Sequence, residues 1–119
     1  MESEQQVTRF WQVARARARL TAMPGYFGPT ALESVPPPTW TWGELAGEAD
    51  AFVERAIADG EIETSAPLAA YDDGVLPTVG ALSILCDGAD RPRALLSTSE
   101  VLERGGELVE RSRVIYSED

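Results

Sequence analysis

Carboxylates, hydroxyls and arginines are the groups with which this chain could do chemistry, because its sequence contains neither lysine nor histidine. All ten of its basic side chains are arginines, and none of them changes protonation state near pH 7. A Ser-His-Asp triad, a histidine-ligated zinc, a lysine Schiff base and a P-loop lysine are therefore excluded. An enzyme with this sequence would have to work through carboxylates, hydroxyls and arginines alone.

Aromatic rings and arginines supply candidates for ligand binding. Trp42 and Tyr71 could stack on a nucleobase, and such stacking contributes about 1–3 kcal/mol per base. Arg91 and Arg93 flank a proline and could contact phosphate, although an ordinary surface role explains them equally well. The paired aspartates of the sequence lie in turns that explain them without a metal, so neither a metal site nor a cofactor is expected.

The composition is that of an ordinary globular protein. A chain of 119 residues is expected to form one domain, residues 1–119, and its apolar fraction of 44% is normal. No apolar stretch approaches the ~20 residues that cross a bilayer, so no membrane association is expected. The N-terminus is acidic and polar, which predicts no signal peptide and a cytoplasmic location. The lone Cys86 agrees with a reducing compartment and is expected to pack within a strand.

Charge limits the partners of this chain. The net charge of −10 argues against tight nonspecific binding to DNA or to an RNA backbone. The arginines nevertheless cluster near the N-terminus, around residue 92 and near the C-terminus. A local positive patch on an acidic body and a set of ordinary surface ion pairs both remain open.

Hydrophobic spacing predicts helices first and strands later, which is the pattern of an α+β domain with a small curled antiparallel sheet or barrel. A first helix within residues 1–23 is expected to begin at a Thr8 cap, and a strap rich in proline and aromatic residues, 24–42, is expected to lack regular structure. Residues 43–119 are expected to form a helix plus a barrel. The helix should cover 45–59 and end at Gly60. The strands are expected at 62–68, 81–86, 93–101 and 107–116, with a hairpin turn over 87–90.

Several short motifs occur in a distinctive order. Trp42-Gly43-Glu44 precedes the second helix, Leu76-Pro77-Thr78-Val79-Gly80 follows the next strand, and Thr98-Ser99-Glu100-Val101 lies beyond the hairpin. In this order they resemble the ASCH domain family, small barrels related to the RNA-binding PUA fold, over roughly residues 9–102. The resemblance implies a curled barrel with a ligand cleft.

The sequence departs from that family at two places. The family segment Gly-x-Lys-Thr-x-Thr reads Gly60-Glu61-Ile62-Glu63-Thr64-Ser65 here, so Ile62 stands at the lysine position and Ser65 keeps a hydroxyl. Longer members also continue into a C-terminal segment and a last helix that have no counterpart in this sequence. The chain is therefore identified as a degenerate, C-terminally shortened member.

The resemblance also implies roles for individual residues. Family members include amidohydrolases that act on acylated cytidine, and by analogy Ser65 becomes the nucleophile and Glu100 the acid/base. If Glu63 lay beside Glu100, their like charges would raise one pKa and create a second acid/base group. In a regular strand Glu61, Glu63 and Ser65 share one face and Ile62 and Thr64 the other, so the geometry of the motif depends on a bulge. The residues expected to bind ligand are Trp42, Glu44, Glu61, Thr64, Tyr71, Arg91 and Arg93.

Three functions remain open from the sequence. The favoured one is binding of a nucleoside, nucleotide or RNA-like ligand in the barrel cleft without the lysine-dependent catalysis. The second is hydrolysis of an acylated cytidine-like molecule by Ser65, Glu63 and Glu100. The third is a protein-interaction subunit whose cleft is completed by a partner or a second copy, which an exposed apolar patch beside a closed cleft would favour.

Overall fold

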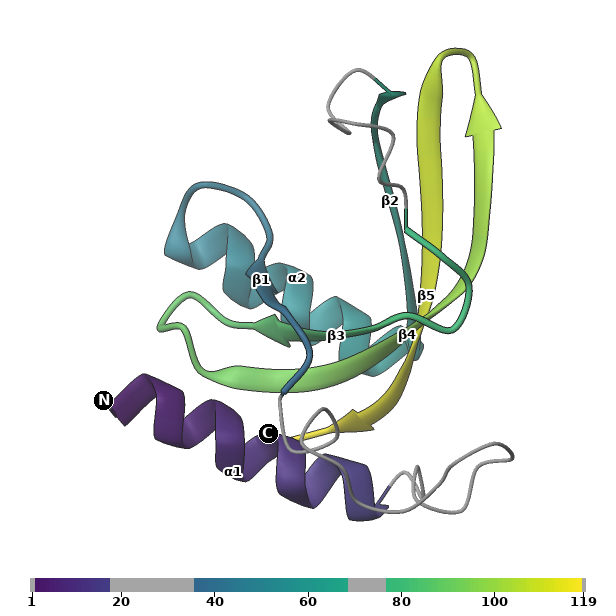
Figure 1. The fold of residues 1–119 in the computed structure, drawn as a ribbon. Coiled ribbons are helices and arrows are strands. Elements are labelled where there is room, and N and C mark those ends of the chain that lie inside the picture. The colour runs from purple at the N-terminus through teal and green to yellow at the C-terminus, as the bar shows by residue number, and fades with distance from the viewer. Residues whose placement is uncertain (1, 18–35, 69–76, 119) are drawn as a thin grey trace.

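The structure is a mixed, curled sheet with a helix on each face (Figure 1). It is a computed structural model that describes residues 2–17, 36–68 and 77–118. The five strands lie in the order β1-β3-β4-β5-β2. This confirms the predicted α+β class with a curled sheet. The elements are α1 (Glu2–Arg17), β1 (Thr39–Thr41), α2 (Ala46–Asp59), β2 (Glu61–Pro67), β3 (Leu82–Cys86), β4 (Pro92–Arg104) and β5 (Glu107–Ser117).

The strap differs from its prediction at its C-terminal end. Thr39–Thr41 form β1, which pairs in parallel with β3. No regular structure was predicted for these residues, and the sheet was predicted to be antiparallel. Threonine and tryptophan suit a pleated surface, and the free edge of β3 offers the hydrogen bonds that such a short strand needs. The remaining pairings, β3 with β4, β4 with β5 and β5 with β2, are antiparallel as expected. Residues 24–35 of the strap and Tyr71 lie outside the described residues.

The first helix starts earlier than predicted. It already includes Glu2, so Thr8 lies inside the helix and is not its N-cap. The glutamates and glutamines before Thr8 are good helix formers, and negative charge near a helix N-terminus is favourable. One face of the helix is apolar and packs on the sheet, because Phe10, Trp11 and Ala14 are buried in a cluster with sheet residues that include Ile84 and Leu95.

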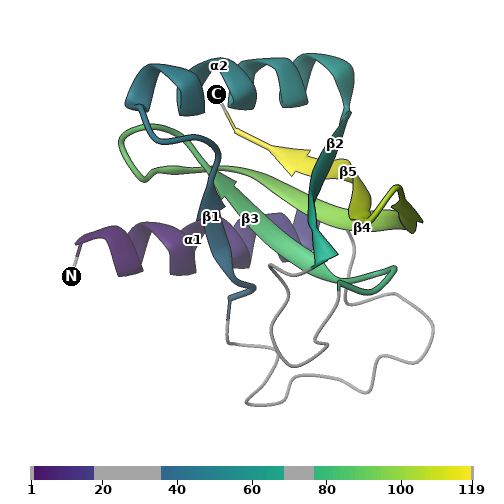
Figure 2. The same ribbon diagram turned by 90° about the horizontal axis from the view of Figure 1, so that it is seen from above.

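The second helix covers the opposite face of the sheet, as Figures 1 and 2 show. Val53 and Ala56 pack on Leu85, Ala94 and Leu96, which alternate with the residues that contact α1. Its end at Gly60 is confirmed, since that glycine takes the left-handed conformation with φ 79° and donates its amide to the Ala56 carbonyl.

Two irregularities in the β4–β5 pairing accompany the curl of the sheet. The register shifts between Leu95 and Leu96 and again between Thr98 and Glu100. Bulges of this kind bend strands and increase their twist. The first half of β4 and the second half of β5 therefore lie with β3 between the helices, while the second half of β4 and the first half of β5 turn away beside β2 (Figure 1).

The turn of the predicted 87–90 hairpin docks on the first half of α2. The Gly88 amide donates a hydrogen bond of 2.8 Å to Oδ1 of Asp50. A Cβ atom added at Gly88 would lie 2.4 Å from the Ala46 carbonyl oxygen, which is closer than atoms can pack. The contact between helix and hairpin thus depends on a glycine at this position.

Gly88→Ala is expected to lower the free energy of unfolding by about 2–3 kcal/mol, because the backbones of the turn and α2 must separate. Thermal unfolding followed by circular dichroism measures the loss, which corresponds to roughly 10 °C in Tm. Gly47→Ala is the matched control, since its added Cβ meets nothing within 4 Å and alanine favours the helix. Equal melting temperatures for the two variants would contradict the close contact.

Candidate functional site: a groove between the edges of the sheet

The candidate site is a groove of about 320 Å³ to which both edges of the curled sheet contribute. β1 and β2 are the two edge strands of the sheet. Because the sheet curls, Trp40 and Trp42 on one side and Ile62 and Thr64 of β2 on the other line the same hollow. β3 and β5 supply the remaining lining. The residues that line the groove are Trp40, Trp42, Ile62, Thr64, Ser83, Glu110 and Ser112.

An aromatic wall is built from β1 and α2. The Trp42 indole stacks on the Phe52 ring with 5.0 Å between centroids and 3° between planes, and Trp42 keeps 42% of its surface exposed. Trp40 meets the same Phe52 ring edge to face at 6.0 Å. Its Nε1 donates a 3.1 Å hydrogen bond to Oγ of Ser83, which fixes the ring against β3. The wall therefore offers a supported, exposed indole to a planar ligand.

A carboxylate and several hydroxyls form the polar part of the groove. Thr98 is buried, and its Oγ1 donates a 2.7 Å hydrogen bond to Oε2 of the half-buried Glu110. An ionised carboxylate accepts hydrogen bonds and donates none, so Glu110 presents acceptor oxygens held in a fixed orientation. Neither Glu110 nor Ser112 was predicted from the sequence as a site residue. Alternation along 107–116 could have placed them on one face, but only the sheet pairing shows that this face lines the groove.

The predicted Glu63 and Glu100 do come together, but on the opposite face of the sheet. Arg111 lies between them, with 2.8 Å from its Nε to Oε1 of Glu63 and 3.0 Å from its Nη1 to Oε1 of Glu100. All three side chains are about half exposed. The hydrogen bond to Glu63, then the negative charges of Glu100 and Glu63, raise the pKa of Arg111. The guanidinium compensates both carboxylates, in place of the bare carboxylate pair that the sequence suggested.

A bulge explains where Glu100 points. Thr98 is paired with Ser112, and Glu100 is paired with Arg111, so Ser99 is an extra residue in β4. In a regular strand Thr98 and Glu100 would share a face. The extra residue reverses that relation, so Thr98 lies on the same face as Glu110, and Glu100 lies on the other face with Arg111. Glu110, and not Glu100, is consequently the carboxylate of the groove.

β2 is a regular strand with strict alternation. Its burial pattern places Ile62 and Thr64 inward, and Glu61, Glu63 and Ser65 are exposed on the other face. Glu61 and Glu63 border a shallow hollow of about 400 Å³ together with Arg111. Ser65 is not among the described residues that line either hollow. Of the two hydroxyl residues proposed from the sequence in this strand, Thr64 is therefore the one in the groove.

The other predicted ligand-binding residues lie in three places. Trp42 lines the groove, as described above. Glu44 is exposed in the loop before α2, and its amide donates to Oε1 of Glu48 at 3.1 Å. Arg91 and Arg93 form salt bridges with Asp87 in the β3–β4 turn. Oδ2 of Asp87 lies 3.1 Å from Nη2 of Arg91 and 3.5 Å from Nη1 of Arg93. Both arginines are thus engaged within the protein, away from the groove.

Asp87 is the buried centre of that arginine network, with 1% of its surface exposed. Burial alone would raise the pKa of Asp87. The backbone amides of Arg91 and Ala89 and the Arg91 side chain donate hydrogen bonds to the carboxylate, and together with the Arg91 charge they hold its pKa below the ordinary value. The carboxylate is therefore kept ionised inside the fold.

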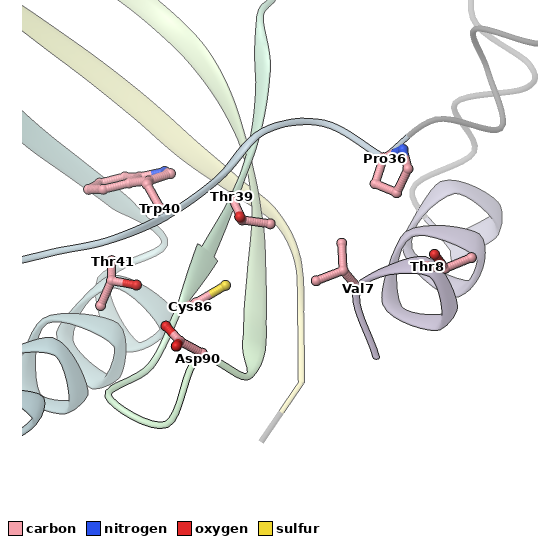
Figure 3. A pocket seen from close by; sticks show the side chains of 8 residues that line it. All are labelled: Val7, Thr8, Pro36, Thr39, Trp40, Thr41, Cys86 and Asp90. Carbon is pink, nitrogen blue, oxygen red and sulfur yellow. The ribbon is translucent and has the colours of Figure 1, made fainter. Parts of the chain in front are cut away.

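A larger cavity of about 620 Å³ lies between α1, β1 and the β3–β4 turn (Figure 3). Cys86 and Asp90 face it from the hairpin, while Val7 and Thr8 border it from α1. Burial, then the charges of Asp90 and Asp87, raise the pKa of Cys86 to about 11. The thiol stays protonated near neutral pH and is a poor nucleophile. Within the described residues, no group of three or more cysteine or acidic side chains is arranged to hold a metal.

The fold and groove define a class of protein: an α+β fold with a half-barrel sheet whose two edges flank a small hollow. Among solved structures the chain is similar to protein EF3133 from Enterococcus faecalis V583, described under the family model DUF984. The TM-score is 0.62 at 14% identity, and the match covers 92% of this chain and 91% of that chain. The two proteins therefore share the fold.

No family model matches the chain, and no curated protein sequence matches it significantly. None of the described helices is long and apolar enough to span a bilayer.

Replacing Asp87 by asparagine is expected to reduce the free energy of unfolding by about 2–4 kcal/mol near pH 7, because the two arginines lose their buried counter-ion. The folded-state pKa of Asp87 lies below its unfolded value of ~3.9. The contribution of the ionised group is therefore complete above the unfolded pKa and is lost as pH falls through the folded pKa. Urea unfolding between neutral pH and pH ~3 measures this.

The difference in stability between wild type and Asp87→Asn should thus shrink as the solution is acidified. Asp59→Asn, which removes an exposed carboxylate at the end of α2, controls for the loss of one negative charge. A stability difference that stays constant with pH would show that the charge of Asp87 does not stabilise the fold.

Proposed function

We propose that this chain is an ASCH-like protein that binds a nucleoside or a nucleoside-like ligand in the groove between β1 and β2, without the lysine-dependent catalysis of that family. The observation that carries the proposal is the Trp42 indole, which is backed by Phe52, exposed, and set beside the hydrogen-bonding groups of Glu110 and Ser112. A planar ring with donors and acceptors on its edge fits that combination. Stacking and edge hydrogen bonds are the two elements of base recognition outside a duplex.

Size and charge favour a single nucleoside over a long nucleic acid. The groove volume lies near the lower end of the ~300–1,000 Å³ typical of small-molecule sites. The described residues that line it include a carboxylate and no arginine, and the chain carries a net charge of −10. A phosphate backbone would gain no compensating charge in this groove.

The lining of the groove supports binding over hydrolysis. Ile62, which stands at the lysine position of the related family, lines the groove and provides neither charge nor hydrogen bond. Loss of one electrostatic stabiliser of an oxyanion commonly costs ~10²–10³ in rate. Ser65, Glu63 and Glu100, the catalytic set of the alternative hydrolase hypothesis, lie on the other face of the sheet, where Arg111 joins the two glutamates.

The binding test is calorimetric titration of the protein with guanosine, cytidine and N4-acetylcytidine in turn. At least one of them is expected to bind, and Trp42→Leu is expected to weaken that ligand about tenfold or more, the loss of one stacking contact. Leu45→Ala is the matched control, because it removes another exposed apolar side chain of the same loop. Binding that is unaffected by Trp42→Leu, or no binding of any of the three, would refute the proposal.

Chromatography of the N4-acetylcytidine sample distinguishes the hydrolase alternative. We expect the compound to remain intact. Release of cytidine that is abolished by both Ser65→Ala and Glu100→Ala would establish the alternative instead, with catalysis on the outer face.

A further inference from the structure

We infer that Glu110 makes the groove selective for a base with two adjacent N–H donors on its edge, the arrangement found on the Watson–Crick edge of guanine. This inference deepens the proposed function and rests on it. It assigns the specificity to a residue that no sequence motif pointed to. The observations behind it are the orientation of the carboxylate, the surrounding hydroxyls and the position of the stacking ring in the same groove.

The carboxylate of Glu110 is held before any ligand arrives. Thr98 donates to its Oε2 at 2.7 Å, and Thr98 itself is only 5% exposed. That hydrogen bond uses one acceptor site of Oε2 and leaves the second site of Oε2 and the sites of Oε1, so each oxygen can still accept an N–H. A carboxylate with an oriented plane binds a pair of parallel N–H donors better than a single one, because two charge-assisted hydrogen bonds form at once.

The common bases differ in what they would present to such an acceptor. Guanine offers N1–H and the 2-amino group side by side, so both can donate. Neutral cytosine and adenine offer one amino group beside a ring nitrogen that is itself an acceptor. Uracil offers N3–H between two carbonyl oxygens, which the carboxylate would repel. A base without the matching N–H donors would leave the Glu110 carboxylate unpaired, and a site discriminates strongly against such a ligand.

The hydroxyls of the groove can serve the remaining edge of the base. The Trp40 Nε1–H donates to Ser83 Oγ, so the Ser83 hydroxyl proton is directed elsewhere. Ser112 and Thr64 line the same hollow on the side of β5 and β2. Hydroxyls rotate to donate or accept, so these groups can satisfy a carbonyl such as guanine O6 while Glu110 takes the N–H groups.

No arginine is among the described residues that line the groove, and three of the described arginines pair with carboxylates elsewhere. Arg91 and Arg93 contact Asp87, and Arg111 contacts Glu63 and Glu100. A phosphate next to the groove would meet the charge of Glu110 without compensation. The preferred ligand is therefore an uncharged guanine nucleoside, and a guanine nucleotide should bind less tightly.

The test compares guanosine with inosine, which keeps N1–H but lacks the 2-amino group, by calorimetric titration of the wild-type protein. Guanosine is expected to bind at least about tenfold more tightly, the effect of one hydrogen bond to a charged group. Uridine should bind still more weakly, and guanosine monophosphate more weakly than guanosine.

Variants then test which residue causes the preference for guanosine over inosine. Glu110→Gln should reduce the preference for guanosine over inosine to within about twofold, since an amide keeps the size but can accept through only one atom. Thr98→Val should reduce the same preference by freeing the carboxylate, and Glu103→Gln, at an exposed site of β4, should leave it unchanged. Thermal melting verifies that each variant is folded.

The outcomes separate this inference from the function on which it rests. Nucleosides that bind with a Trp42-dependent affinity but without a preference for guanosine overturn the inference and leave the proposed function intact. A preference that survives Glu110→Gln in a folded protein also overturns it. No detectable binding of any nucleoside overturns both.

Discussion

The buried carboxylate of Asp87 is the interaction on which the rest of the structure depends. It accepts hydrogen bonds from the amides of Ala89 and Arg91 and thereby shapes the β3–β4 turn. It also holds Arg93, which reaches Glu54 on α2 and donates to the carbonyl of Glu118 just beyond β5. One charge thus ties the turn, the helix and the end of the last strand together. Because α2 carries Phe52, on which Trp42 stacks, this network indirectly sets the position of the aromatic wall of the groove.

Most of the fold could be predicted from the sequence because its determinants are local. Apolar spacing at helical period identified α2, Gly60 marked its end, and the Asp-Gly turns separated the strands. β1 was missed because a long-range contact decides it: Thr39–Thr41 form a strand only because β3 offers a parallel edge. The start of α1 was missed for a local reason, since the helix-forming residues before Thr8 outweighed the capping signal at Thr8. Only the first of these determinants lies outside a short window of sequence.

The site was less accessible to sequence reasoning because the face that a side chain occupies depends on strand register. Regular alternation correctly grouped Glu61, Glu63 and Ser65 on one face of β2. It could not reveal the extra residue at Ser99, which turns Glu100 away from the groove and toward Arg111. Nor could it show that Glu110 and Trp42 would line the same hollow, since these residues are far apart in the chain. The sequence identified residues with suitable side chains, but only the curled sheet shows which of them lie together.

The central claim is that a nucleoside binds between β1 and β2, and the three tryptophans of the chain report on it separately. Trp40 and Trp42 line the groove, whereas Trp11 belongs to α1 and is buried in a different cluster. The most direct measurement is the indole N–H region of a ¹H–¹⁵N correlation spectrum during titration with guanosine and, separately, with cytidine. We expect progressive shifts of the Trp40 and Trp42 signals while the Trp11 signal stays in place. A shift of Trp11 alone, or three stationary signals with both nucleosides, would contradict binding in this groove.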